Sequence, residues 1–279
     1  MTSSFLILLP DVPASALTVA STQVYDTDHL PHSSFYGQGY LCSRLSAAAS
    51  SVSITFDLGT GNSRTIDHLV LGGVKSLLAT NVAKALVQGS NNGTTWVNQL
   101  GTTSALSSKT ADGPRNDSII FTATKNDDLA GTLIAYRYFR FTMETSSGTS
   151  NFPLNKLYFG EAFDIGQEPS NYELTLIDEK DADTWKYPRG HTIMSKAFYS
   201  KHRLVVEWDG ITDAKANEFM NKVLLNPWSN TVFLYTQSYK DPLYDNTLLF
   251  CRIVPDGCYV EKRNDVDNWN DIKVEFEEV

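Results

Sequence analysis

The sequence predicts a mainly β protein of two domains: an N-terminal β-sandwich jelly roll and a C-terminal β-sandwich with one packed α-helix. Three observations predict it. Short apolar runs of period two, each closed by turn residues, fill the first half of the chain. The second half holds strand patterns around one amphipathic helix pattern. A length of 279 residues provides two domains at about 100–200 residues each.

The N-terminal half contains a series of short predicted strands separated by turn signals. Residues 53–58 alternate apolar and polar side chains and stop at the Gly-rich turn 59–62. Residues 91–93 (NNG) form another turn signal, because Asn and Gly tolerate a positive φ. The other predicted strands are 66–71, 83–87, 119–122, 136–143 and 157–159. Many short strands with turn punctuation are typical of sandwiches and jelly rolls.

The pattern changes between residues 163 and 171, where Gly166, Pro169 and Ser170 interrupt it. We therefore expect a jelly-roll domain at 20–165 and a second domain at 166–279. Residues 1–19 are expected to form an N-terminal arm or strand. Their apolar run 5–9 (FLILL) is too short for a signal sequence or a membrane span, and no targeting segment is predicted.

A helix is predicted over residues 212–225 of the second domain. Thr212 is a good N-cap, Asp213 suits the positive end of the helix dipole, and Pro227 stops the helix. Its apolar stripe consists of Ala216, Phe219, Met220, Val223 and Leu224. Strands are predicted at 172–177, 203–208, 232–235, 248–254 and 272–279, so the expected order is β-β-α-β-β-β.

Charge and cysteine content narrow the class of protein. The net charge is −9, which argues against nucleic-acid binding and against an anionic membrane as the main partner. The three cysteines are too few for a disulfide framework. Cys251 and Cys258 flank a turn in which they would be out of register, so we expect free, buried thiols, as for Cys42.

No standard catalytic motif is present: the sequence lacks a nucleophile elbow, a P-loop, a dinucleotide-binding fingerprint and a zinc-protease motif. Acidic pairs occur at 181–183 and 265–267, but glycosidase chemistry needs two carboxyl groups facing each other across a cleft. Short acidic loops are most simply solvated turns. We therefore expect a protein that is not an enzyme, with a hidden glycosidase as the open alternative.

Histidines and aromatic residues offer two further candidate sites. His29 and His32 have a spacing that suits a metal on a helix, but Pro31 favours a solvated loop. His68 falls in a strand and is expected at its rim. The segment 25–44 contains Tyr25, Phe35, Tyr36, Tyr40 and Arg44. Such rings stack on sugars, with Arg donating to hydroxyls, or they simply plug the end of a sandwich.

Four motifs, in order, resemble the discoidin, or coagulation-factor C-type, domains of galactose-binding-like fold. They are 54–59 (ITFDLG), 83–98 (AKALVQGSNNGTTWVN), 136–141 (YRYFRF) and 154–160 (LNKLYFG). The resemblance covers about residues 20–163. In the hairpin, Asn92 and Gly93 are expected to make the tight turn, and Trp96 to return into the core.

This resemblance implies ligand binding by loops at one end of the jelly roll. It makes Tyr36, Tyr40 and Arg44 candidate ligand contacts, without identifying the ligand. Extracellular members tie their ends with two cysteines, whereas this region has only Cys42. A structural calcium ion is compatible with the resemblance, but no Asp-rich loop demands one, so no cofactor is expected.

The C-terminal part resembles distal or minor tail proteins of long-tailed bacteriophages. The cues are 158–164 (YFGEAFD), the lone helix between strands, and the ending 269–279 (WNDIKVEFEEV). The resemblance implies a ring-forming homo-oligomer, often a hexamer, that contacts the tail tube, hub and tape-measure proteins. An acidic channel would let DNA slide without binding. The protein would then lie in the virion tail after assembly in the host cytoplasm.

Two hypotheses of function follow. The first is a structural component of a phage tail tip or baseplate, whose jelly roll contacts host-surface carbohydrate. The alternative is a stand-alone carbohydrate-binding, lectin-like module, and an enzyme accessory domain is a third interpretation. The first predicts a closed oligomer, and the second predicts a monomer or dimer with sugar-dependent behaviour.

Overall fold

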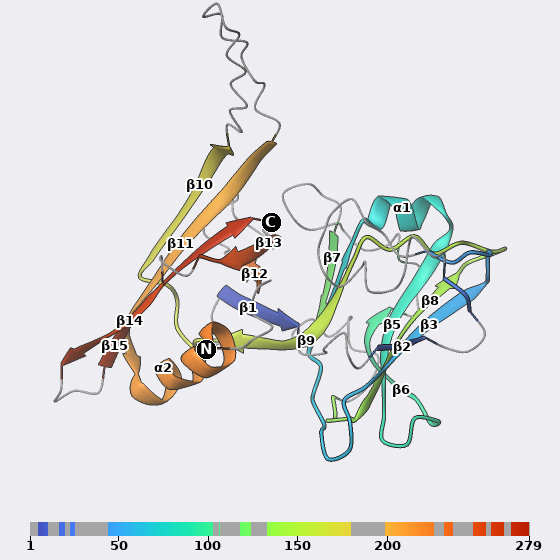
Figure 1. Cartoon of the computed structure of the whole chain (residues 1–279), viewed down its shortest axis with the longest axis horizontal. Helices are drawn as coiled ribbons and strands as arrows, with labels where there is room; N and C mark the ends of the chain where they lie inside the picture. Colours follow the sequence, from blue (N-terminus) through green and yellow to red (C-terminus); the bar gives the residue numbers. More distant parts are fainter. Residues whose placement is uncertain are drawn as a thin grey trace, which may run out of the picture. The chain divides into compact units, whose positions relative to one another are not determined.

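The computed structural model describes the parts of the chain from which the fold is built: 5–10, 17–19, 23–25, 44–102, 106, 118–123, 133–179, 199–225, 232–236, 248–254, 258–264 and 269–278. The chain is mainly β, as predicted (Figure 1). It divides into two compact units. The N-terminal unit contains the described residues of Leu6–Phe163 and Leu234–Leu248, and the C-terminal unit those of Met1–Phe5, Asp164–Phe233 and Leu249–Val279.

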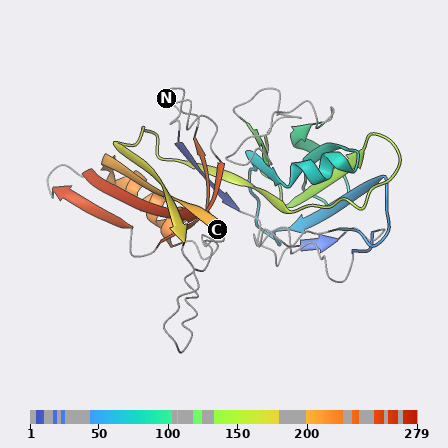
Figure 2. The same ribbon diagram turned by 90° about the horizontal axis from the view of Figure 1, so that it is seen from above.

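The N-terminal unit contains two antiparallel sheets (Figures 1 and 2). The five-stranded sheet has the order β2 (Leu17–Val19), β3 (Ser51–Asp57), β8 (Tyr138–Thr145), β5 (Val82–Ser90) and β6 (Val97–Thr102). In the other sheet, β4 (His68–Gly72) lies between β7 (Ser118–Thr122) and β9 (Lys156–Asp164), with β1 (Phe5–Pro10) next to β9. The chain crosses from sheet to sheet at most connections, which makes this unit a jelly-roll sandwich.

The core of this unit lies between the two sheets. Phe56 of β3 meets Phe159 of β9 edge to face, with ring centroids 4.8 Å apart. Phe139 of β8 lies 6.4 Å from the same ring. The short helix α1 (Val74–Ala79) adds Val74 and Leu77 to this core. The alternation predicted for 53–58 is therefore confirmed, because Ile54 and Phe56 are the buried members of β3.

The C-terminal unit contains one described sheet whose central strand is β15 (Trp269–Glu278). Strand β11 (Tyr199–Thr212) pairs with one side of β15, and β10 (Asn171–Glu179) pairs with β11. The other side of β15 pairs with β13 (Leu248–Ile253) near residue 278 and with β14 (Tyr259–Asn264) near residue 270. These pairings with β11 and β15 are antiparallel. The remaining described strand is β12 (Val232–Thr236), whose first two residues belong to this unit.

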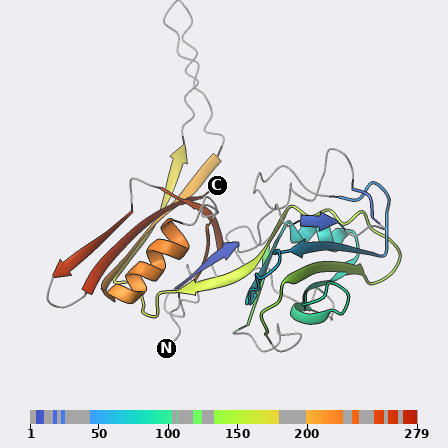
Figure 3. The same cartoon turned by 60° about the horizontal axis from the view of Figure 1, so that its bottom comes forward.

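The predicted helix is confirmed and packs on this sheet (Figure 3). It consists of α2 (Asp213–Phe219) and a π-helical turn, η4 (Met220–Leu224). The Thr212 side chain accepts the backbone N–H of Lys215 at 3.4 Å, as an N-cap does. Ala216, Phe219 and Val223 of the predicted stripe are buried, and its other two members are half-buried. The sequence pattern did not predict the π turn, which spaces residues differently from an α turn.

His68 corrects one expectation. It lies in a strand, as predicted, but it is 1% exposed rather than at a rim. Its Nδ1 lies 3.0 Å from a carboxylate oxygen of Asp67, which also accepts the backbone N–H of Ala162. The adjacent strands β7 and β9 enclose β4 on both sides, so the position is central in its sheet. His68 therefore lies on a strand that is paired on both sides, not at the edge of the sheet.

The two described cysteines do not form a disulfide with each other. Cys251 is buried and Cys258 is half-buried, and both are free thiols. Burial raises the pKa of Cys258, whose Sγ donates to the carbonyl of Val254 at 3.3 Å. Cys42 lies outside the described residues. No helix in the described part of the chain is long and apolar enough to cross a membrane.

Candidate functional site

The three predicted ligand contacts have different outcomes. Arg44 is described and exposed. Tyr36 and Tyr40 lie outside the described residues, as do Phe35, His29 and His32. Tyr25, from the same aromatic segment, is a core residue: it is 8% exposed, and burial raises its pKa above the ordinary value of a tyrosine. Tyr25 therefore packs in the core, as one of the two interpretations of this aromatic segment predicts.

The described residues on either side of the segment 26–43 lie at the same place in the sandwich. Tyr25 and Leu45 form an antiparallel bridge, which holds these flanking residues together. The Ser46 backbone N–H and hydroxyl both donate to the carbonyl of Val24, at 3.0 and 2.9 Å. The Leu45 N–H donates to the carbonyl of Asn151 at 2.8 Å. The fold therefore starts and ends this aromatic segment beside the connection between β8 and β9.

Two further turns meet at this end of the sandwich. The Thr145 N–H donates to the carbonyl of Ser50, and the Ser146 N–H donates to the carbonyl of Asn81, each at 3.0 Å. We call residues 44–50, 78–81 and 145–152 the loop end. Its exposed polar side chains are Arg44, Ser46, Ser50, Asn81, Ser146, Ser147, Thr149 and Asn151. Hydroxyl, amide and guanidinium groups of this kind can donate and accept hydrogen bonds with a polyhydroxylated ligand.

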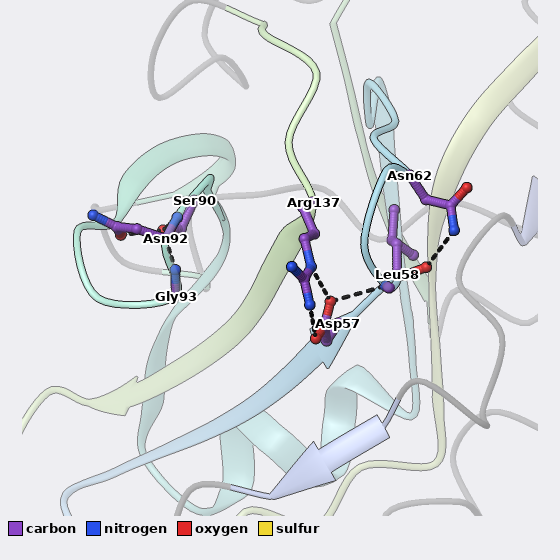
Figure 4. A network of polar contacts seen from close by, with 8 residues as sticks. Asp57, Leu58, Asn62, Ser90, Asn92, Gly93 and Arg137 are labelled. Carbon is purple, nitrogen blue, oxygen red and sulfur yellow. Dashed lines mark hydrogen bonds and ion pairs between the residues drawn. The ribbon is translucent and has the colours of Figure 1, made fainter.

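The opposite end of the sandwich holds a network of polar contacts that is closed on itself (Figure 4). Arg137 donates two hydrogen bonds of 2.7 Å to the carboxylate of Asp57, which also accepts the Gly59 N–H at 2.9 Å. The hydrogen bond from Arg137 holds the pKa of Asp57 below its ordinary value. The Asn62 side chain donates to the carbonyl of Leu58 at 2.9 Å. These groups are occupied in fixing the turn after β3.

In the hairpin between β5 and β6, the polar side chains likewise form hydrogen bonds within the turn (Figure 4). The Ser90 hydroxyl accepts the N–H of Gly93 at 2.9 Å, and Asn92 Oδ1 accepts the N–H groups of Thr94 and Thr95, each at 2.9 Å. Gly93 has a φ of 71°, so the tight turn predicted at this position is confirmed. These polar atoms shape the turn.

The prediction that Trp96 plugs the core is wrong. Trp96 is half-buried and lies under the guanidinium of Arg140, whose Cζ is 4.3 Å from the ring centroid. Asn98, two residues later, bonds to Gln88 on the outer surface of the five-stranded sheet. Trp96 therefore lies on the outer surface with Arg140. Leu100 supplies the buried position of β6, because an irregularity at Gln99 shifts the register between Asn98 and Leu100.

No group of three or more His, Cys, Asp or Glu side chains able to hold a metal ion occurs within the described ranges. The expected acidic pairs at 181–183 and 265–267 lie outside those ranges.

Comparison with known proteins gives a likeness of fold only. No protein-family model matches the sequence, and no curated protein matches it. Among solved structures, the chain is similar to the carbohydrate-binding module CBM32 of AlyQ in complex with 4,5-unsaturated mannuronic acid, at 18% identity. That match covers 53% of this chain and 95% of the other, with a TM-score of 0.33.

Two further solved structures are similar over about half of this chain. CBM32-1 from a family 31 glycoside hydrolase of Clostridium perfringens is 14% identical, with 55% of this chain and 96% of the other covered and a TM-score of 0.37. Chitosan-binding module 1 of a chitosanase/glucanase from Paenibacillus sp. IK-5 is 17% identical, with 52% and 96% covered and a TM-score of 0.36.

Proposed function

We propose that the N-terminal unit binds carbohydrate through its loop end and acts by binding, without catalysis. One observation carries the proposal. The Tyr25–Leu45 bridge holds the described residues that flank the segment 26–43 at the loop end, beside the exposed Arg44. That segment contains Phe35, Tyr36 and Tyr40 between glycines. Aromatic rings with a few hydrogen-bonding groups around them are the usual elements of a sugar-binding surface.

The polar groups of the loop end support the same class of ligand. Arg44, Thr149 and Asn151 are exposed there. Guanidinium, hydroxyl and amide groups of this kind can form hydrogen bonds with sugar hydroxyls.

A glycan panel with matched variants tests the proposal. The whole protein is titrated with neutral and acidic oligosaccharides, and the best ligand is then measured on Tyr36→Ala, Tyr40→Ala and Arg44→Ala. We expect each variant to weaken binding about tenfold or more, since one stacked ring or charged hydrogen bond contributes on that order. Arg64→Ala is the control, because Arg64 is exposed near the opposite end, beside Tyr136. Absence of any bound glycan, or equal affinity in all variants, would refute the proposal.

As a second candidate, we propose a structural role in a phage tail tip or baseplate, with the C-terminal unit forming a ring in the virion tail. The partners would be further copies of the chain and the tail tube, hub and tape-measure proteins. One observation favours assembly. Strands β10 and β14 each have one neighbouring strand among the described residues, and sheet edges of this kind can pair with another chain.

Light scattering of the whole protein tests this second candidate. A closed oligomer of fixed mass, independent of added sugar, is the expected result. A monomer across the accessible concentration range would leave the carbohydrate-binding function as the sole proposal.

A further inference from the structure

The outer surface of the five-stranded sheet is polar, and its side chains are ordered by the alternation of the strands. On β8, Phe139 and Phe141 point into the core, so Arg140 and Thr142 point outward. On β5, the same alternation sends Gln88 outward. We call this surface the outer face and define it by Ser53, Thr55, Gln88, Trp96, Asn98, Arg140 and Thr142.

Gln88 lies at the centre of a hydrogen-bonded network on the outer face. Its Oε1 accepts Nε of Arg140 at 2.9 Å and the hydroxyl of Thr142 at 3.3 Å. Its Nε2 donates to Oδ1 of Asn98 at 2.7 Å. The Thr142 hydroxyl is also 3.1 Å from that of Ser53. The network therefore fixes the guanidinium of Arg140 by its Nε, and no hydrogen bond between described residues uses Nη1 or Nη2.

Trp96 holds the same guanidinium from a second direction. The Cζ of Arg140 lies 4.3 Å from the centroid of the indole ring, which is a cation–π contact. The ring also removes water from one side of the cation, and this burial lowers the pKa of Arg140. An arginine fixed on two sides loses little conformational freedom when a ligand binds it, which favours affinity.

Arg140 differs from the neighbouring cations of this sheet in having no acidic partner among the described residues. Arg137 is paired with Asp57 at 2.7 Å, and Lys84 is paired with Glu144 at 3.1 Å. The described side-chain contacts of Arg140 are with Gln88 and Trp96, and both partners are uncharged. This half-buried guanidinium has no counter-ion among the described residues, so an anionic ligand group could neutralise its charge.

We propose that the outer face is a second binding site, in which Arg140 receives the carboxylate of an acidic sugar in a polysaccharide. The edge carrying Nη1 and Nη2 matches the two oxygens of a carboxylate. Thr55 lies opposite Arg140 on β3, and its hydroxyl suits a sugar hydroxyl. Apart from Trp96, the residues of the outer face are polar, and Leu86, which lies opposite Thr142 on the same side of the sheet, is buried. A hydroxylated ligand therefore fits this surface better than an apolar peptide. This site is separate from the loop end, and its test is independent of that proposal.

Calorimetry on the whole protein tests the site with trisaccharides of galacturonic, mannuronic and glucuronic acid and with the methyl ester of each. We expect at least one free acid to bind with saturation. Its methyl ester should bind about tenfold more weakly or worse, because the ester keeps the sugar and removes the charge. Arg140→Gln should bind the free acid more weakly by the same factor, and it should bind the methyl ester with the same affinity as the wild type. Arg140→Lys should be intermediate, because lysine keeps the charge without the two-pronged geometry.

Arg64→Gln is the matched control, because it removes one exposed positive charge from the same unit, and we expect it to bind like the wild type. A second measurement uses the unaltered protein: the NMR signals of the Arg140 Nε–H and the Trp96 indole N–H should shift on addition of the acid. Failure of all three acids to bind, equal affinity for acid and ester, or unchanged affinity in Arg140→Gln would overturn the proposal. Binding lost in Arg44→Gln but kept in Arg140→Gln would assign the ligand to the loop end instead.

Discussion

The contact between the helix and the sheet of the C-terminal unit gives the sharpest prediction of stability. Phe219 of α2 is fully buried, and its ring centroid lies 6.4 Å from that of Trp208 on β11. Replacing a fully buried phenylalanine by alanine removes its transfer free energy and leaves a cavity. We expect Phe219→Ala to lower the free energy of unfolding of this unit by about 3–5 kcal/mol.

Urea denaturation followed by tryptophan fluorescence measures the effect, because the loss of packing reaches the ring of Trp208. Leu225→Ala is the control: Leu225 ends the same helical segment but is 65% exposed, so its replacement should change stability by less than about 0.5 kcal/mol. Equal effects of the two variants would refute the reasoning, since they would mean that Phe219 does not anchor the helix to the sheet.

Three other variants probe single interactions. Arg137→Gln should destabilise the protein at neutral pH. Arg137 lowers the pKa of Asp57, so the ion pair stabilises the folded protein fully above the unfolded-state pKa of Asp57. Its contribution to the free energy of unfolding is lost as the pH falls through the lower folded-state pKa. Urea titrations at several pH values measure this loss. Gly89→Ala should lower stability by about 1–3 kcal/mol in thermal unfolding, because its methyl group would meet the ring of Tyr136. Thr212→Ala should cost about 1 kcal/mol in urea denaturation through loss of the helix cap.

Each of these predictions has an outcome that contradicts it. A stability difference for Arg137→Gln that persists unchanged in acid would exclude the ion pair as its cause. An unchanged melting temperature in Gly89→Ala would mean that the Tyr136 ring moves without cost. For Thr212→Ala, the control Ala214→Ser changes an exposed helix position without touching the cap, and an equal loss in both would refute the capping role.

The strands that alternate cleanly and the amphipathic helix were predictable because their patterns are local. Ile54 and Phe56 are buried, as period two requires, and Ala216 and Phe219 lie on the buried stripe. Strand β14 was not predicted, because 261–263 is a run of three charged residues that interrupts any apolar alternation. Its pairing with β15 depends on a partner elsewhere in the chain, which local patterns do not reveal.

The candidate site was only partly predictable. The loop end follows from the Tyr25–Leu45 bridge, a contact between distant residues, while the sequence supplied only its aromatic content. The orientation of Trp96 was predicted wrongly because the register shift between Val87 and Gln88 decides which face it joins. Arg140, in contrast, lies between two core phenylalanines, so alternation alone would have placed it on the outer face.

The most direct test of the central claim is a titration of the whole protein with its best glycan, comparing the wild type with the Tyr36→Ala/Tyr40→Ala double variant. We expect saturable binding by the wild type and unchanged thermal unfolding of the double variant. Because each ring should contribute about tenfold, the double variant should bind about a hundredfold more weakly. Equal binding by both proteins would contradict the assignment of carbohydrate binding to the loop end.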